Sequence, residues 1–275
     1  MIAAVHFERR CLAAAVFLLP SVARAGAWAR DPGSAYLRAG AGSFDGVSTN
    51  ESFATAGGQF SSLAAEGYAE VGLGAGLEID MSARWVETRT DFEGRAETND
   101  GPEDLELLLA WAPVSGSDAV MFQLGSRVAN YDRLEPDDVG LGVPERGPGG
   151  VDILAGGAFG HSFWPAPAWI DVDLLWRVRL GGASTAARLR TELGRTLVGP
   201  VAGAITVEMQ PAFGRDIDQP SGAPAPIPGG WSVGAKLLSN VAHGFGLGAD
   251  VAWMPEWLND GPGYRLGLGV TWERP

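Results

Sequence analysis

Apolar and polar residues alternate along much of the chain. In the segment 170–180 the even positions are apolar and the odd positions carry aspartate or arginine, apart from Leu175. On a helix, which advances roughly 100° per residue, these charges would be spread around the axis and leave no wide apolar face. A strand places alternate side chains on opposite faces. The segment is therefore predicted to be a β-strand.

The same period of two recurs after residue 25. No run of about 18 apolar residues occurs there, so a helical membrane span is not expected. The alternation predicts twelve strands, at residues 34–45, 59–73, 77–91, 103–112, 119–131, 150–163, 168–181, 187–198, 204–215, 230–240, 245–256 and 263–273.

The connections between these strands differ in length in a regular way. Short turns are expected at 74–76, 113–118, 164–167, 199–203 and 241–244. Longer connections, rich in glycine, proline, asparagine and aspartate, are expected at 46–58, 92–102, 132–149 and 216–229. Short turns at one end and mostly long loops at the other are the plan of bacterial outer-membrane barrels. We therefore predict an all-β fold, a transmembrane antiparallel up-and-down β-barrel of twelve strands.

A soluble β-sandwich is the alternative fold. A sandwich would expose a polar face rich in lysine, but Lys236 is the one lysine of the chain. The predicted strands are also longer than the usual five or six residues of soluble sheets. Aromatic residues near strand ends would form the girdles of a membrane barrel. These residues are Tyr36, Trp111, Tyr131, Trp169, Trp231, Trp253, Trp257, Tyr264 and Trp272.

The first 25 residues have the composition of a secretory signal peptide. Arg9 and Arg10 precede a short apolar run, and Ala23 and Ala25 fit a cleavage site for small residues. The mature chain, 26–275, is expected to be a single barrel domain. The only cysteine, Cys11, lies in the removed part, so neither a lipid anchor nor a catalytic thiol is expected. The expected destination is the outer membrane of a Gram-negative bacterium after Sec-type export.

The charge balance restricts the partners. The chain has 20 basic and 33 acidic residues and a formal charge of −13. A polyanion would be repelled by this field, so a nucleic acid partner is not expected. The expected partners are outer-membrane lipid and lipopolysaccharide, the barrel-assembly machinery and a small-molecule solute.

If the apolar faces contact lipid, the opposite faces line the barrel with interleaved arginine and carboxylate side chains. One interpretation is that these charges pair across neighbouring strands, because unpaired buried charges are costly. The other is that four arginines of the seventh and eighth strands form a basic ladder facing carboxylates of the third and fourth, which would select and orient a polar or anionic solute. The candidate lumen and selectivity residues are Arg177, Arg179, Arg188, Arg190, Asp171, Asp173, Glu78, Asp80, Arg84, Glu106, Arg127, Glu192 and Glu208.

Catalytic and metal motifs are weak. His161 and Ser162 are adjacent, but neighbouring strand residues point to opposite faces. Asp171 and Asp173 share a face, but nearby arginines favour a structural role. With two histidines and no cysteine in the mature chain, neither a cofactor nor a transition-metal centre is expected. We predict a protein that is not an enzyme, with a lipid-modifying outer-membrane enzyme as an alternative.

Acidic residues also cluster in two predicted external loops. Carboxylates near lipopolysaccharide could hold Ca²⁺ or Mg²⁺, although neither loop has the spacing of an EF-hand. Solvated loops are the simpler interpretation. A non-catalytic structural or surface-binding barrel acting through these loops is therefore a further alternative. The residues are Glu93, Glu97, Asp100 and Glu103 in one loop, and Asp132, Glu135, Asp137, Asp138 and Glu145 in the other.

Two short stretches carry a family resemblance. The first stretch is Gly26, Ala27 and Trp28 leading to 33–36, and the second is the hairpin 68–79. Both resemble outer-membrane β-barrel transporters, a group that includes proteins labelled for the meta-pathway of phenol degradation. The resemblance implies a barrel over nearly the whole mature chain and a transport role. The chain departs from many such barrels in lacking a terminal aromatic residue. The resemblance and the predicted charged lumen together lead us to expect a passive channel or transporter for a small solute.

Overall fold

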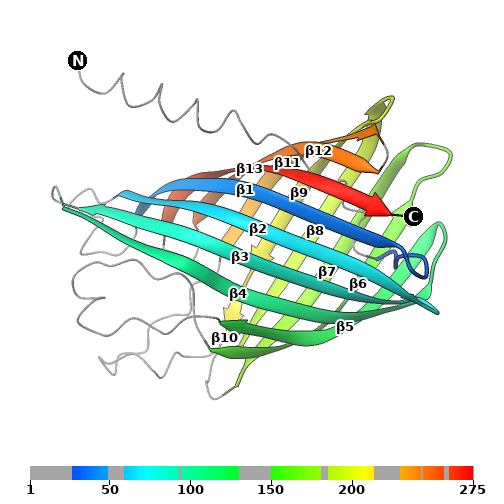
Figure 1. Cartoon of the computed structure of the whole chain (residues 1–275), viewed down its shortest axis with the longest axis horizontal. Coiled ribbons are helices and arrows are strands. Elements are labelled where there is room, and N and C mark those ends of the chain that lie inside the picture. The colour runs from blue at the N-terminus through cyan, green and yellow to red at the C-terminus, as the bar shows by residue number, and fades with distance from the viewer. Residues whose placement is uncertain are drawn as a thin grey trace.

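The computed structural model describes residues 27–48, 59–92, 95–129, 150–180, 185–213, 230–242, 244–256 and 260–274. The predicted signal peptide, 1–25, lies outside the described residues. Figure 1 shows the strands wrapping around a single barrel. Among the described residues, no helix has the length and apolar character needed to cross a membrane.

The barrel is built from long strands. Pro211 divides one of them, so that β10 continues the line of β9 and pairs with β8 as β9 does. The strands are β1 (Ala35–Ser48), β2 (Gln59–Gly74), β3 (Leu77–Phe92), β4 (Arg95–Val114), β5 (Asp118–Ala129), β6 (Val151–Ser162), β7 (Ala168–Arg179), β8 (Thr185–Val198), β9 (Val201–Gln210), β10 (Ala212–Phe213), β11 (Gly230–Ala242), β12 (Phe245–Glu256) and β13 (Asp260–Arg274).

Each strand pairs antiparallel with its neighbours in the chain, and β1 pairs with β13 to close the sheet. With β9 and β10 taken as one, this is a closed barrel of twelve strands, so the predicted fold class is confirmed. Five tight hairpins gather at one end, called here the short-turn end, on the right in Figure 1. In the β2–β3 hairpin, Ala75 and Gly76 both have positive φ, 53° and 76°. This backbone matches the twist of the paired strands.

The fourth strand differs from its prediction. It begins at Arg95 rather than at residue 103, because Pro102 does not end it. Pro102 lies opposite Trp85 at an irregularity of the β3–β4 register, and proline is tolerated at such bulges. Glu97, Asp100 and Glu103, predicted in an external loop, therefore lie in a strand, and that prediction is wrong. Glu93 and the second acidic loop, 132–145, lie outside the described residues.

The two faces of the barrel wall have opposite chemistry. Large apolar side chains such as Leu107 and Leu124 are exposed on the outside, Leu124 to 60%. Glu78 and Asp152 are buried inside. This is the reverse of a soluble protein and suits a wall between lipid and a polar interior.

Leu175, which broke the alternation of the sequence, occupies an inward-facing position. There it forms an apolar cluster with Leu154 of the adjacent strand β6 and Leu108 of β4. The strand geometry is regular at this position, and the departure is in the choice of side chain alone. The cluster fills part of the barrel interior beside the charged residues.

Candidate functional site: the lumen and the segment that enters it

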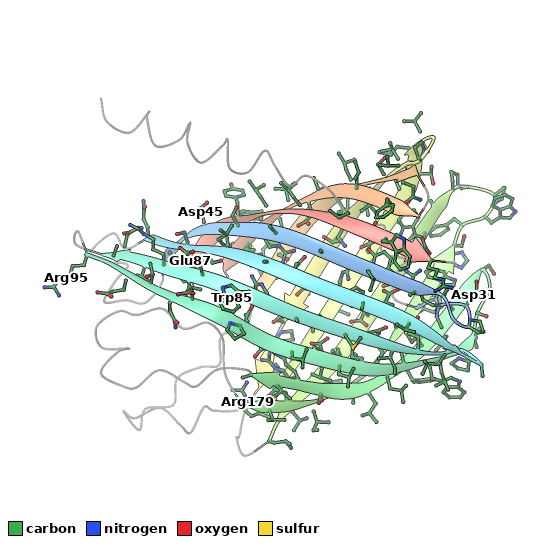
Figure 2. All side chains as sticks on the ribbon, viewed as in Figure 1. Asp31, Asp45, Trp85, Glu87, Arg95 and Arg179 are labelled. Atoms are coloured by element: carbon green, nitrogen blue, oxygen red, sulfur yellow. The ribbon has the colours of Figure 1, made fainter. Side chains whose placement is uncertain are left out.

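The segment 27–34, which precedes β1, enters the barrel at the short-turn end. Ala27 is 0% exposed, and its N–H donates to Asp171 Oδ2 at 3.2 Å. The indole Nε1 of Trp28 donates to the Gly116 carbonyl oxygen at 3.0 Å. Figure 2 shows Asp31 at this end of the barrel, and Arg95 and Asp45 at the other. Residues 27–30 therefore occupy part of the lumen at the short-turn end, and 31–33 are exposed beside it.

Small residues in the barrel wall make room for this segment. Ala27 packs in a cluster with alanines of β4, β5 and β6, including Ala158. A Cβ added at Gly160 would lie 2.4 Å from the Trp28 ring, and one added at Gly72 would lie 2.2 Å from the Asp31 carbonyl oxygen. Side chains at these two positions would displace the segment. The wall is thus shaped to fit it.

Arg30 is the most strongly held residue of the segment. Its Nε lies 2.5 Å from Glu70 Oε2, and its Nη1 lies 2.6 Å from Glu273 Oε1. Its backbone N–H donates to Glu78 Oε2 at 2.8 Å. The guanidinium carbon lies 4.6 Å from the centre of the Tyr36 ring, within the range of a cation–π contact. We call these groups the Arg30 site.

Two further side chains complete the Arg30 site. The Tyr68 hydroxyl donates to Glu70 Oε1 at 2.9 Å, and its ring meets that of Tyr36 edge to face. Asp80 lies opposite Glu70 on the neighbouring strand and is 5% exposed. In the described part of the chain, Asp80 Oδ1 and Arg30 Nη2 are buried and have no hydrogen-bond partner. The site therefore holds more carboxylate than its one guanidinium neutralises.

A second charged cluster lies between β8 and β11. Glu192 Oε2 is 2.8 Å from Arg190 Nη2 and 2.9 Å from Lys236 Nζ. Its other oxygen accepts a hydrogen bond from Trp169 Nε1 at 3.4 Å. Asp173 is paired in register with Arg190. One carboxylate thus bridges two cations from different strands.

The remaining predicted residues of β5 to β9 also have charged or polar neighbours. Arg179 and Arg177 lie 3.0 and 3.6 Å from Asp152 of β6. The Gln210 amide donates to Glu208 at 2.7 Å. Arg127 forms an ion pair with Asp104.

The predicted basic ladder is divided among different partners. Arg188 Nη2 lies 3.9 Å from Glu106 Oε1, which joins β8 to the fourth strand across the lumen. The other three arginines pair with β6 or with a residue of their own strand, and Arg84 pairs with Glu103 at 2.7 Å. Of the four arginines, Arg188 therefore lies near a predicted carboxylate of the fourth strand, Glu106. Whether these residues set solute selectivity stays a prediction.

The sequence did not single out Arg30, Glu273, Asp152 or Asp250. Asp250 lies 3.9 Å from both Arg38 and Arg265. Asp152 and Asp250 share the inward parity of their strands, so the alternation contained a signal for them. Arg30 lies before the first strand, where the sequence has no alternation that could predict which way its side chain points.

His161 has an acidic neighbour. Its Nδ1 lies 2.7 Å from Asp118 Oδ1 near the short-turn end, and its ring stacks edge to face with Phe163. A histidine with an orienting carboxylate is one part of a nucleophilic site. The adjacent Ser162 points to the opposite face of β6. Among the described residues, no group of acidic, histidine or cysteine side chains is arranged to hold a metal ion.

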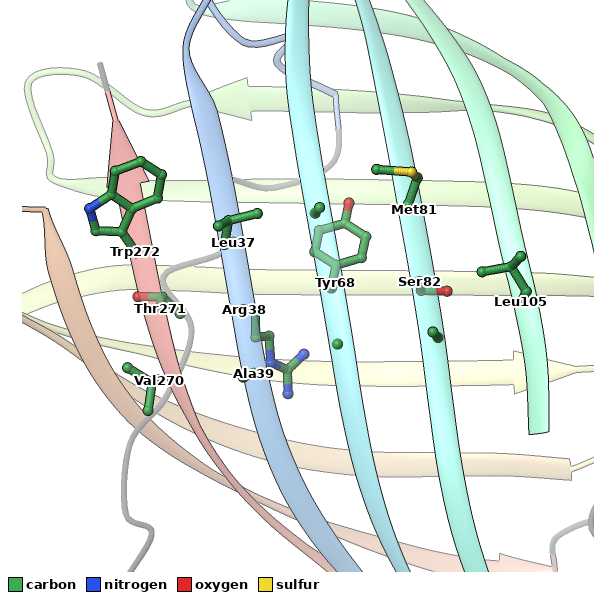
Figure 3. Close-up of a pocket in the computed structure, with 13 residues that line it drawn as sticks. Leu37, Arg38, Ala39, Tyr68, Met81, Ser82, Leu105, Val270, Thr271 and Trp272 are labelled. Atoms are coloured by element: carbon green, nitrogen blue, oxygen red, sulfur yellow. The ribbon is translucent and has the colours of Figure 1, made fainter. Parts of the chain in front are cut away.

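The outer wall carries a shallow groove over β13, β1, β2, β3 and β4 (Figure 3). Ala39 and Gly67 are among the small residues that line it. Large apolar side chains surround them, so the groove suits contact with lipid tails rather than a polar ligand. These side chains are Leu37, Met81, Leu105, Val270 and Trp272.

Comparisons with known proteins bear on the fold. A scan of protein-family models and a search of curated proteins both give no match. The structure is similar to the COG4313 outer membrane channel from Pseudomonas putida F1, with a TM-score of 0.69 and 12% identity over 92% of this chain and 100% of the other.

Two more distant similarities point the same way. The NanC porin gives a TM-score of 0.55 and 7% identity over 86% of this chain and 98% of the porin. The translocator domain of the autotransporter NalP from Neisseria meningitidis gives a TM-score of 0.52 and 8% identity over 98% of this chain and 95% of that domain. Identities this low establish a shared fold. The chain has the fold of outer-membrane β-barrels.

Proposed function

We propose that this protein is an outer-membrane channel or passive transporter for a small polar or charged solute. The observation that carries the proposal is the interior of the barrel, where charged side chains from many strands line one face of a wall that is apolar outside. Structural stability alone would be served by an apolar interior at least as well, because buried ion pairs seldom stabilise more than packed apolar groups.

The arrangement of charge supports a role in selectivity. The Arg188–Glu106 pair and the Glu192 cluster bring cations and carboxylates to different parts of the lumen. Rings and rows of charged side chains select and orient permeating solutes in channels. A solute that carries charge is therefore favoured over a neutral apolar one.

The relatives in fold agree with this proposal. The Pseudomonas putida protein is an outer membrane channel, and NanC is a porin. The resemblance of 68–79 to transporters labelled for the meta-pathway of phenol degradation also supports transport. For this chain, a charged substrate or product of such chemistry would fit the lumen better than a neutral phenol.

The location is part of the proposal. Cleavage after residue 25 would leave Gly26 as the first residue, one position before Ala27 in the lumen. The apolar outer wall would contact outer-membrane lipid and lipopolysaccharide, after insertion by the barrel-assembly machinery. Amino-terminal sequencing of protein purified from outer-membrane fractions tests this, with Gly26 as the expected first residue. A mature chain that retains the apolar run would contradict it.

Recording in planar bilayers tests the channel. The wild type and a variant with Arg177, Arg179, Arg188 and Arg190 changed to glutamine are compared for conductance and for ion selectivity, measured as a reversal potential. Loss of four lumen cations should shift selectivity toward cations. Arg89→Gln is the matched control, because Arg89 lies on β3 and pairs with Asp91 of the same strand.

Two results would contradict the proposal. Unchanged conductance and selectivity in the four-arginine variant would remove the role of these residues. A folded barrel that stays silent, both in the wild type and in variants that release the segment 27–34, would favour a structural or surface-binding barrel.

A further inference from the structure

The Arg30 site has the parts of a receptor for a guanidinium group. Carboxylates from three strands, Glu70, Glu78 and Glu273, surround Arg30, and the guanidinium lies over the Tyr36 ring. Carboxylates paired with the planar guanidinium fork and an aromatic face beside it are the usual means of binding such a cation. Arg30 is 3% exposed, so the cation is held away from solvent.

The site keeps a group of carboxyl side chains when Arg30 is set aside. Glu70, Glu78 and Asp80 line adjacent strands on the same inward face, and Asp80 Oδ1 has no hydrogen-bond partner in the described structure. Buried carboxylates are costly unless a cation is near. A barrel wall that carries these groups therefore favours another cation wherever Arg30 leaves.

The residue that fills the site belongs to a segment that the barrel does not need for its closure. Residues 27–34 add no strand to the sheet. Apart from Arg30, the segment is held by hydrogen bonds from Ala27, Trp28 and Gly33, by one from the Gly72 N–H to the Ser34 carbonyl, and by packing against small residues. It can leave the lumen while every ladder between strands stays intact.

We propose that the Arg30 site binds the guanidinium or ammonium group of a solute, and that Arg30 occupies it as a tethered competitor. The segment 27–34 then closes the short-turn end of the lumen until a cationic solute displaces it. This inference deepens the proposed channel function, on which its meaning for transport rests. The binding itself does not depend on conduction.

Thiol labelling tests the displacement. Ala29 is changed to cysteine in a Cys11→Ser background, and the rate of reaction with a soluble maleimide is measured on purified protein in detergent. Ala29 packs against the buried cluster around Ala27, so slow labelling is expected. Agmatine, which carries a guanidinium and an ammonium group, should accelerate labelling in a saturable way, because a ligand that binds only the released form shifts the population toward it; we expect an increase of about tenfold or more.

The controls separate specific binding from screening. Potassium chloride at equal ionic strength and the dianion succinate should leave the rate unchanged. Arg30→Gln should label fast without agmatine, and Arg89→Gln should behave as the wild type. Equal acceleration by potassium chloride, or fast labelling of the wild type without any addition, would overturn the proposal.

Calorimetry tests the receptor. Agmatine should bind Arg30→Gln more tightly than the wild type, because the tethered competitor is gone, and adding Glu70→Gln should weaken that binding. If agmatine fails to bind Arg30→Gln in its folded form, judged by heat-modifiable migration on gels, the receptor does not exist. If Arg30→Gln does not fold, the agmatine titration of the wild type tests the receptor instead, and the absence of binding there would overturn the proposal. A protein that labels as expected but conducts no ions would refute the channel and leave the receptor standing.

Discussion

The substitution Gly160→Ala tests whether Trp28 of the segment 27–34 packs against β6 inside the lumen. Gly160 lies on the inner face of β6, opposite Asp171 and Ala119 on its two neighbouring strands. A Cβ at this position would lie 2.4 Å from two carbons of the Trp28 ring and 3.0 Å from the Ala27 Cβ. Carbon atoms in contact usually lie about 3.5–4 Å apart. The ring must therefore move by roughly 1 Å, judged from that contact distance.

The cost should fall on the segment rather than on the barrel. Adding a methyl group to a filled site typically costs about 1–3 kcal/mol. At about 1.4 kcal/mol for each tenfold change, this lowers the ratio of docked to released segment by roughly 5-fold to 150-fold. Trp28 belongs to no ladder of the sheet, so releasing it leaves the strands paired.

The assay combines maleimide labelling of the Ala29→Cys reporter with conductance in planar bilayers. Gly160→Ala should label faster than the parent and spend more time conducting, with an unchanged urea midpoint for the barrel. Gly67→Ala is the matched control, because nothing lies within 4 Å of a Cβ added there. Gly67 is also on a strand and has a negative or extended φ, so alanine is tolerated there.

Two outcomes would refute this reasoning. If Gly160→Ala labels and conducts as Gly67→Ala does, Trp28 does not occupy the lumen beside β6. If Gly160→Ala unfolds the barrel instead, the segment is part of its core and cannot act as a displaceable closure.

Further predictions concern the wall and the lumen. Leu154→Ala should destabilise the barrel by about 2–5 kcal/mol in urea unfolding, because Leu154 packs in a buried apolar cluster; a loss below about 1 kcal/mol would contradict that packing. Leu107→Arg, on the exposed outer face, should cost about 2–4 kcal/mol at the bilayer midplane and less toward its surfaces, and an equal stability in lipid vesicles would contradict the lipid-facing assignment. A double-mutant cycle of Arg188→Gln with Glu106→Gln should give a coupling below about 1 kcal/mol, because both side chains retain solvent access; a larger value would indicate a dry constriction.

Much of the strand layout could be read from local alternation. The segment 168–181 was predicted as a strand, and β7 runs from Ala168 to Arg179. Leu175, the exception in the pattern, also occupies an inward-facing position of the strand. A period of two depends on neighbouring residues alone, so it survives in the sequence without knowledge of the partner strands.

The fourth strand shows the limit of such reasoning. Gly101 and Pro102 carry a strong local signal for a break, which led to a predicted loop at 92–102. The strand continues because the opposing β3 offers a bulge opposite Pro102. The acidic residues around it were consequently misplaced. A bulge is a property of two strands in register, and one strand's sequence does not contain it.

Alternation of apolar and polar residues within single strands is enough to predict the class of this protein, an all-β wall with one apolar and one charged face. What fills the lumen was decided by tertiary structure. Arg30 lies in a segment without a period, and its carboxylate partners come from β2, β3 and β13. Such partners meet only when the barrel closes, because closure and strand register set which side chains face one another across the interior.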